Sequence, residues 1–274
     1  MEITLSDDTT LIDRLPHRFG ILTVPMQPTP WFEDEAFWVS TYPFIFPDSS
    51  FVTAVSDVPK LVALSRCSGG SVLDMCCGPG RYAVPLAKHG YGITGVDRSS
   101  FLLEKARAYA DQQEVAVTFV QDDMRNFVKP DSFDLALSLF TSFGFFDDSD
   151  DNRTALRNLH TSLKPGGVLV MELIGKEPLA RIFRDTGSQS LPSGELLFER
   201  RSIVGDWERV ENNWYIIAGR EVRTFRFCLW LFSARELKDL LYSVGFSEVR
   251  ICGDLDGKTY GPNANRLVAV ARKG

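Results

Sequence analysis

The central part of the chain alternates short apolar runs with stretches in which apolar residues recur at helical spacing. Apolar runs of strand length occupy residues 71–75, 91–96, 116–121, 133–140 and 168–173. Helical spacing between them predicts helices over residues 81–89, 99–112 and 150–163. Mainly apolar strands that alternate with helices are typical of a parallel sheet covered on both faces. The pattern therefore predicts an α/β core.

The N-terminal stretch, residues 1–60, is rich in proline and aromatic residues. Proline removes a backbone N–H donor and clashes with the preceding helical turn, so the stretch cannot be one long helix. We expect a helix over residues 52–64 to lead into the core. Aromatic side chains at this density lose burial energy if left in water, so we predict that residues 25–46 form a lid over the site.

After Ile174 the alternation stops, and the chain reads as antiparallel strands near residues 195–204, 214–218 and 222–231. In the last of these, Phe225, Phe227 and Leu229 share a mainly apolar face with Arg223 and Leu231, while Arg226 and Trp230 lie on a mixed face. The core resumes with a helix that Ser233 and Glu236 cap (S-x-x-E) and Gly245 ends. Strands 246–252 and 266–271 finish the chain. These boundaries predict a cap (1–60), a core (61–174 and 233–274) and an inserted antiparallel β subdomain (175–232).

One loop has the pattern of a nucleotide site. The first strand ends at Asp74, a turn follows at Gly78 and Gly80, and a helix begins near Arg81, so backbone N–H groups at the helix start face a ligand. The second strand ends at Asp97, nineteen residues beyond Gly78, where a carboxylate can accept both ribose hydroxyl protons. The spacing predicts an adenosine cofactor. The loop alone also fits the dinucleotide pattern G-x-G-x-x-A, which leaves a nicotinamide-dependent oxidoreductase open.

Later segments distinguish these alternatives. Asp123-Met124 follows the third strand, and Leu163-Lys-Pro-Gly-Gly167 leads into the fifth. In this order the segments resemble the class I S-adenosylmethionine-dependent methyltransferases, over residues 70–174 and 233–272. The stretches 73–81 (LDMCCGPGR) and 139–146 (LFTSFGFF) resemble more closely a bacterial group of small methyltransferases, whose members also carry an aromatic N-terminal cap and inserted strands.

The resemblance implies a Rossmann-like sheet, mostly parallel with an antiparallel last strand, and a small antiparallel β insertion. It implies S-adenosyl-L-methionine as cofactor and S-adenosyl-L-homocysteine as product. The implied cofactor-binding residues are Asp74, Gly78 and Gly80 along the methionine part, Asp97 at the ribose, Asp123 and Met124 at the adenine, and the Leu139 carbonyl at the α-amino group. Arg98 is a further predicted cofactor-binding residue, with no part of the cofactor assigned to it. Arg81 either clamps the cofactor carboxylate or caps the sheet edge, Asp74 either binds the cofactor or organises its loop, and Met124 either contacts the ring or packs in the core.

The acceptor is less well defined by the sequence. Methyl transfer from a sulfonium draws mainly on alignment and exclusion of water, and needs a base only when the nucleophile keeps its proton. The candidates for that base are Glu172 and Tyr260, and the candidates for substrate contact are Trp31, Tyr42, Arg226 and Trp230. We expect a small molecule that is methylated on N or O. An RNA or protein acceptor and a protein that only senses the cofactor are the alternatives within this resemblance.

Composition limits the partners further. A net charge of −6 disfavours nucleic acid, whose binding requires clustered Lys and Arg. No apolar run reaches the roughly 18 to 20 residues of a membrane span, and the first residues lack the pattern of a secretion signal, so we expect a cytoplasmic protein. Five cysteines without paired C-x-x-C spacing predict neither disulfides nor zinc, and we expect no metal. The sequence leaves monomer or homodimer open.

Overall fold

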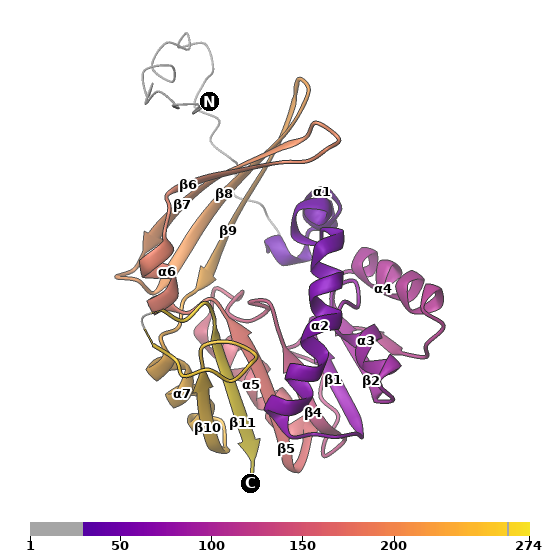
Figure 1. Ribbon diagram of the computed structural model, residues 1–274. Coiled ribbons are helices and arrows are strands. Elements are labelled where there is room, and N and C mark those ends of the chain that lie inside the picture. Colours follow the sequence, from indigo (N-terminus) through magenta and orange to yellow (C-terminus); the bar gives the residue numbers. More distant parts are fainter. Residues whose placement is uncertain (1–29, 262) are drawn as a thin grey trace, which may run out of the picture.

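Within residues 30–261 and 263–274, which the computed structural model describes, the strands form a seven-stranded and a four-stranded sheet (Figure 1). The larger sheet has the order β10-β11-β5-β4-β1-β2-β3. Its strands are β1 (Ser71–Met75), β2 (Gly92–Asp97), β3 (Thr118–Gln121), β4 (Phe133–Ser138), β5 (Leu163–Leu173), β10 (Phe246–Cys252) and β11 (Leu267–Lys273). β11 runs antiparallel to β5 and β10, and the other pairs are parallel. The predicted Rossmann-like sheet, mostly parallel with an antiparallel last strand, is confirmed.

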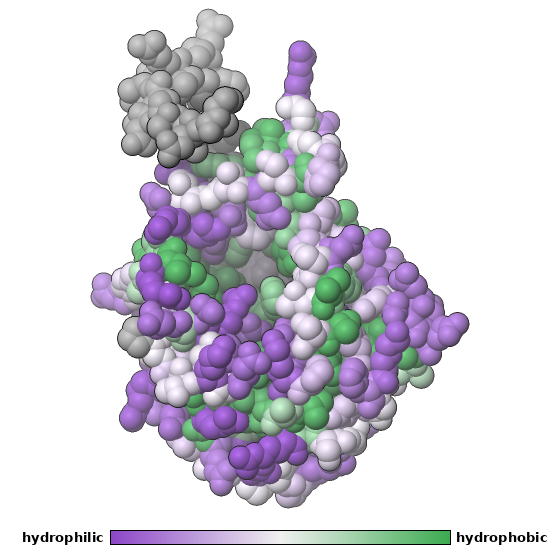
Figure 2. All heavy atoms as spheres, in the orientation of Figure 1, coloured by the Kyte–Doolittle hydropathy of each residue, from purple (hydrophilic) through white to green (hydrophobic). Residues whose placement is uncertain are grey.

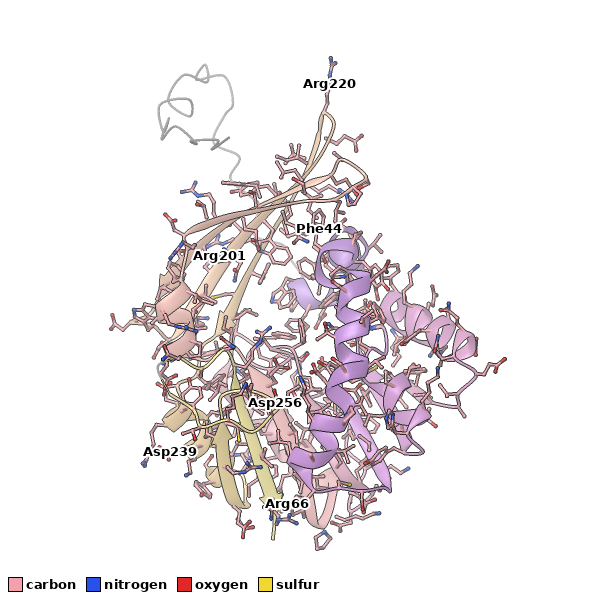
Figure 3. The ribbon with its side chains drawn as sticks, viewed as in Figure 1. Phe44, Arg66, Arg201, Arg220, Asp239 and Asp256 are labelled. Carbon is pink, nitrogen blue, oxygen red and sulfur yellow. The ribbon has the colours of Figure 1, made fainter. Side chains whose placement is uncertain are left out.

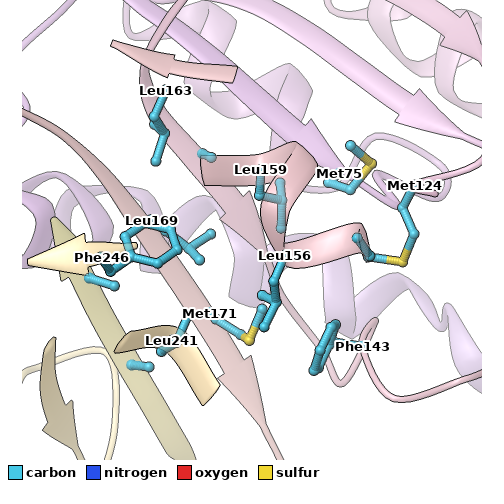
Figure 4. Packing of buried hydrophobic residues seen from close by; sticks show 14 of the residues in the cluster. Met75, Met124, Phe143, Leu156, Leu159, Leu163, Leu169, Met171, Leu241 and Phe246 are labelled. Atoms are coloured by element: carbon cyan, nitrogen blue, oxygen red, sulfur yellow. The ribbon is translucent and has the colours of Figure 1, made fainter. Parts of the chain in front are cut away.

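Helices cover both faces of this sheet. Neighbouring residues of a strand point to opposite faces, so each core strand packs apolar side chains against helices on both sides. Val72 packs with α2 (Asp48–Ser65) and α3 (Ala83–Lys88), whereas Leu73 packs with α5 (Ser149–Ser162) and α7 (Ala234–Ser243). Figure 4 shows the second face, where residues of α5 and α7 meet those of β5. The capping box at the start of α7 is formed as the sequence predicts. α4 (Ser100–Gln112) packs beside β3.

The four-stranded sheet has the order β6-β7-β8-β9 and is antiparallel throughout. It contains β6 (Thr186–Ser190), β7 (Leu196–Val204), β8 (Arg209–Ala218) and β9 (Glu221–Trp230). The predicted β insertion is confirmed, with one correction: residues 176–182 form a helix, α6 (Lys176–Ile182), where we expected strand. A helix of seven residues is too short to show a helical period in the sequence, so the prediction was wrong there.

The described part of the N-terminal stretch forms a short 3-10 turn, η2 (Trp31–Glu33), and a helix, α1 (Glu35–Ile45), which we did not predict. Residues 30–46, which are part of the predicted cap segment 1–60, are called the cap from here on. Phe37 and Phe44 of α1 are buried against Ile216 and Phe225 of the four-stranded sheet. Figure 3 shows Phe44 on α1, beside this sheet. Residues 25–29 of the predicted lid lie outside the described residues.

These contacts decide where a site can form. η2 contacts β9, and α1 contacts α4, so the cap bridges the four-stranded sheet and the core. α2 runs through the boundary that we placed at residue 60, and the division into three parts stays a prediction. In the described part of the chain, every helix is too short or too polar to cross a membrane.

Candidate functional site

A cavity of about 270 Å³ lies between the carboxyl ends of the core strands, the cap and the four-stranded sheet. In the space-filling view the molecule is hollowed between the four-stranded sheet and helices α1 and α2, and both hydrophilic and hydrophobic residues border the hollow (Figure 2). We call the part lined by residues 74–82, 96–98 and 122–124 the loop half. The part lined by the cap, residues 140–146, β8 and β9 is the aromatic half.

The loop after β1 turns through left-handed backbone conformations at Cys76, Gly78 and Gly80, with φ of +59°, +54° and +78°. L-residues with a side chain adopt these angles at a cost, which explains the glycines. A Cβ on Gly78 would stand 3.4 Å from the Phe46 ring of the cap, and one on Gly80 would stand 3.3 Å from Ala106 of α4. Gly78 therefore lines the cavity, while Gly80 is required by close packing against α4.

Asp97 joins this loop to the end of β2. Its Oδ2 accepts a hydrogen bond from the Gly78 N–H at 2.8 Å, and its Oδ1 accepts one from the Ser99 N–H at 3.0 Å. Burial raises the pKa of Asp97 to about 6, against the effect of these two hydrogen bonds. The carboxylate therefore fixes the loop and still lines the cavity, where each oxygen retains lone pairs for a ligand.

Asp74 and Arg81 are buried in the loop half without an ion pair between them. Burial, with the nearby charge of Asp97, raises the pKa of Asp74 to about 7, and its Oδ2 has no partner among the described residues. The Arg81 guanidinium is stacked between two rings, 4.0 Å from the centroid of Phe140 and 5.0 Å from that of Phe46. Arg81 is 6% exposed, burial lowers its pKa, and its Nη1 has no partner among the described residues.

A buried cation without a hydrogen-bonded anion is unfavourable. Arg81 is therefore suited to receive an anionic group from a ligand.

At the other end of the loop half, Asp123 is held by two arginines. Arg98 donates to its Oδ2 at 2.9 Å, and Arg125 donates to both oxygens at 3.0 and 2.7 Å. Burial works to raise the pKa of Asp123, but these hydrogen bonds outweigh it and the pKa is lowered. Glu33 of the cap pairs with Arg98 at 2.8 Å and with Arg125 at 3.5 Å. The cap is thus tied by charge to the predicted adenine end.

A second tie lies beside Asp97. Glu35, the first residue of α1, accepts hydrogen bonds from the Ser99 hydroxyl and the Ser100 N–H, both at 2.7 Å, at the start of α4. Met124 and Leu139, two other predicted cofactor residues, are buried and line the cavity, and Met124 also packs in the core.

Glu172 is buried beneath the exit of β4, where Phe140 and Thr141 both have positive φ, +62° and +59°. Its Oε2 accepts from the Phe140 N–H at 3.4 Å, and its Oε1 pairs with Arg266 at 3.0 Å. Burial raises the pKa of Glu172. The cavity wall does not include Glu172 among its described residues. Its geometry supports a role in holding the 140–141 turn, and its predicted role as a base stays a prediction.

Tyr260, the other predicted base, donates to Glu177 at 2.8 Å and lies off the cavity wall. Burial raises its pKa, so its phenol keeps its proton.

The aromatic half is a continuous wall of rings from segments far apart in the sequence. Trp31 stands at its centre, with ring centroids 5.0 Å from Phe37, 5.0 Å from Phe145 and 4.9 Å from Phe227. Trp214 of β8 extends the wall, 5.1 Å from Phe227. Most of these pairs meet edge to face or tilted, which is the favourable arrangement for aromatic rings.

Of the four residues predicted to contact substrate, Trp31 lines the cavity. Tyr42 packs against Phe46 and Phe101 away from the wall. Arg226 pairs with Glu211 at 2.6 Å, and the Trp230 indole donates to the Phe146 carbonyl at 2.7 Å. The alternation of β9 turns Phe227 and Leu229 to the cavity instead, and places Arg226 and Trp230 on the opposite face.

Phe145, Trp214, Phe227 and Leu229 are among the wall residues that were not predicted as site residues. For Phe227 and Leu229 a signal was available, because both belong to the mainly apolar face of the 222–231 strand. Phe145 belongs to the stretch 139–146 that carries the family resemblance, whereas no local pattern marks Trp214. Across residues 30–261 and 263–274, no three His, Cys, Asp or Glu side chains are grouped as metal ligands.

Comparison with known proteins is consistent with this geometry. Residues 72–167 match the family described as a methyltransferase domain. A protein of Geobacillus sp. (strain WCH70), whose name assigns it provisionally as a methyltransferase, is 27% identical over 232 residues, which cover 78% of this chain and 89% of the relative.

Two solved structures have a similar fold. The CcbJ methyltransferase from Streptomyces caelestis superposes with a TM-score of 0.70 at 20% identity, covering 81% of this chain and 95% of that protein. The sugar N-methyltransferase KedS8 from Streptoalloteichus sp. ATCC 53650 gives a TM-score of 0.60 at 25% identity, covering 81% and 87%.

Proposed function

Because the chain belongs to the class I S-adenosylmethionine-dependent methyltransferases, we propose that it transfers a methyl group to an N or O atom of a small molecule. The observation that carries the proposal is the cavity itself, in which a charged loop half continues into an apolar aromatic half. The cofactor would occupy the first and the acceptor the second. The dinucleotide alternative loses its support, since it depended on the glycine loop alone.

The cofactor fits the loop half group by group. Asp97 would accept the ribose hydroxyls, and Arg81 would receive the methionine carboxylate, since both have free hydrogen-bonding capacity there. Asp74 and the Leu139 carbonyl would receive the α-amino group. Asp123 and the Met124 backbone would contact the adenine, with Arg98 acting indirectly by holding Asp123 in place. Four hydrogen bonds from Arg98 and Arg125 hold the Asp123 carboxylate ionised and fixed in place beside the predicted adenine position.

S-adenosyl-L-methionine supplies a methyl group that is already activated by its sulfonium. When bound by Asp97, Arg81 and Asp74, it would donate this methyl group to the acceptor's lone pair and leave as the neutral thioether S-adenosyl-L-homocysteine. The acceptor's proton, where it has one, then leaves to solvent. The chain contributes alignment and exclusion of water, which together supply a large part of such a rate enhancement.

Calorimetry with S-adenosyl-L-homocysteine tests the proposal directly. We expect binding in the micromolar range, on the order of 7 to 9 kcal/mol, and no comparable affinity for NAD. A metabolite panel screened for S-adenosyl-L-homocysteine formation would then identify the acceptor. A preference for NAD, or no binding of either ligand, would contradict the proposal.

A further inference from the structure

A ligand in the aromatic half would contact mainly apolar side chains. Its wall residues are Trp31, Phe32, Phe37, Trp38, Ile45, Phe46, Phe140, Thr141, Ser142, Phe145, Phe146, Trp214, Phe227 and Leu229. None of these described residues is ionisable. The wall therefore presents no acid, base or cation to an acceptor, in contrast to the loop half.

The wall has few polar side-chain atoms, and several of them are engaged within the protein. The Ser142 hydroxyl donates to the Leu139 carbonyl at 2.6 Å, and the Thr141 hydroxyl accepts from the Ile174 N–H at 3.1 Å. The Trp38 indole donates to the Phe32 carbonyl at 3.0 Å. The indole nitrogens of Trp31 and Trp214 are buried and have no hydrogen-bond partner among the described residues, so these two N–H groups are the main donors left at this wall. A ligand in the aromatic half thus finds few hydrogen-bond partners.

This wall discriminates between classes of acceptor. A sugar carries several hydroxyl groups, and each one buried without a partner costs about 1–3 kcal/mol. A flat ring loses no such partners and gains about 25 cal/mol for each Å² of apolar surface that it buries. A cationic acceptor would be repelled by the sulfonium in the same cavity, where low polarity strengthens the repulsion.

From these observations we infer that the acceptor is an uncharged molecule with a flat, apolar ring at its reacting end, and that the nucleophilic N or O is attached to this ring. The inference rests on the proposed function and names its substrate class. An amino group on an aromatic ring is unprotonated at neutral pH, so its lone pair is available without a base from the protein. This acceptor differs from that of a sugar N-methyltransferase, although one such enzyme shares the fold.

Binding of defined probes to the protein saturated with sinefungin, in which an ammonium-bearing carbon replaces the methyl sulfonium and keeps its positive charge, tests the inference. The probes are 2-naphthol and 2-naphthylamine as ring acceptors, glucosamine as an amino sugar, and benzyltrimethylammonium as a ring with a fixed charge. We expect one molecule of each naphthalene probe to bind at least about tenfold more tightly than either of the others. Equal or tighter binding of glucosamine or of the cation would overturn the inference.

Matched variants localise the probe. Phe227→Ser removes a ring from the wall, whereas Phe198→Ser removes one from β7, where Phe198 packs with Tyr215 away from the cavity. We expect Phe227→Ser to weaken 2-naphthol binding about five- to tenfold and Phe198→Ser to leave it unchanged. Phe145→Ser, in a loop of the same wall, provides a second variant should Phe227→Ser not fold.

Equal affinities in all variants would overturn the inference. Failure of the unaltered protein to bind S-adenosyl-L-homocysteine would instead contradict the proposed function, so the two failures are distinguishable.

Discussion

The loop half and the aromatic half of the cavity are built by opposite means. The loop half comes from turns at the ends of adjacent strands, is rich in charge, and depends on short hydrogen bonds such as that from the Gly78 N–H to Asp97 at 2.8 Å. In the aromatic half the cap, the β4 exit and the inserted sheet meet mainly through ring contacts, with a few hydrogen bonds such as that from the Trp230 indole to the Phe146 carbonyl. The comparison indicates that cofactor recognition is carried by local geometry, and acceptor choice by long-range packing.

The largest expected effect lies in the loop half, at Asp97. We expect Asp97→Ala to weaken S-adenosyl-L-homocysteine binding by about 1.5 to 3 kcal/mol, because charge-assisted hydrogen bonds to the ribose and to the loop are both lost. Calorimetry measures the change. Asp239→Ala on the far surface of α7 (Figure 3) is the matched control, and should bind normally. Unchanged affinity in Asp97→Ala would show that the ribose lies elsewhere.

Arg81→Met tests whether the buried guanidinium serves the cofactor. We expect about tenfold weaker binding of S-adenosyl-L-homocysteine, the scale of one hydrogen bond to a charged group. Binding of 5′-methylthioadenosine, which lacks the amino-acid part, should not change. The free variant should melt no lower than the unaltered protein, because an apolar side chain replaces a buried unpaired charge. Equal losses for both ligands would instead favour the sheet-edge role.

The pH dependence follows from Asp74 and Asp97, whose pKa values are raised to about 7 and about 6. If the ionised forms bind the cofactor, affinity should fall as the pH drops through 7 and then 6, by about tenfold per unit for each group that must lose a proton. Stability of the free protein should change in the opposite sense, because a carboxyl with a raised pKa contributes most when protonated. Calorimetry between pH 8 and 5 measures the first effect, and a flat profile would contradict it.

Glu172→Gln tests whether Glu172 acts as a general base or only positions the 140–141 turn. The amide still accepts from the Phe140 N–H, so we expect turnover within about fivefold of the unaltered protein, whereas loss of a general base costs about 100-fold or more. The pH profile of kcat with the identified acceptor should keep its shape. A loss of 100-fold together with a changed profile would identify Glu172 as the base.

The smallest expected effect concerns the ties between the halves. Glu35→Ala removes the acceptor for the Ser99 hydroxyl and the Ser100 N–H, so we expect a loss of about 1 kcal/mol of unfolding free energy, typical of a helix cap. Hydrogen exchange over residues 30–46 should become faster in this variant, and should slow in the unaltered protein when S-adenosyl-L-homocysteine binds. Exchange that is already slow and insensitive to ligand would indicate structural packing without a lid function.

The sequence predicted mainly those features that residues close together in the chain determine. Strand 71–75 and the helix cap at Ser233 were predicted to the residue, because period and capping chemistry act over a few positions. The same holds for the loop half, where the left-handed turn at Gly78 brings its N–H to Asp97 across one β-α-β unit. The short helix α6 and the helix α1 were missed because neither carries a clear period.

Which rings meet in the aromatic half was decided by the tertiary structure, although the sequence predicted that the aromatic residues of the cap cover the site. The rings that meet come from four separate segments of the chain: Trp31, Phe145, Trp214 and Phe227. The pattern within one segment does not predict which rings of the other segments it contacts. The same holds for Glu33 and its arginines, whose pairing requires η2 to lie against the end of β2. Apolar burial has no direction, so many arrangements of these rings would satisfy it, and only the packing of the cap between the two sheets selects one.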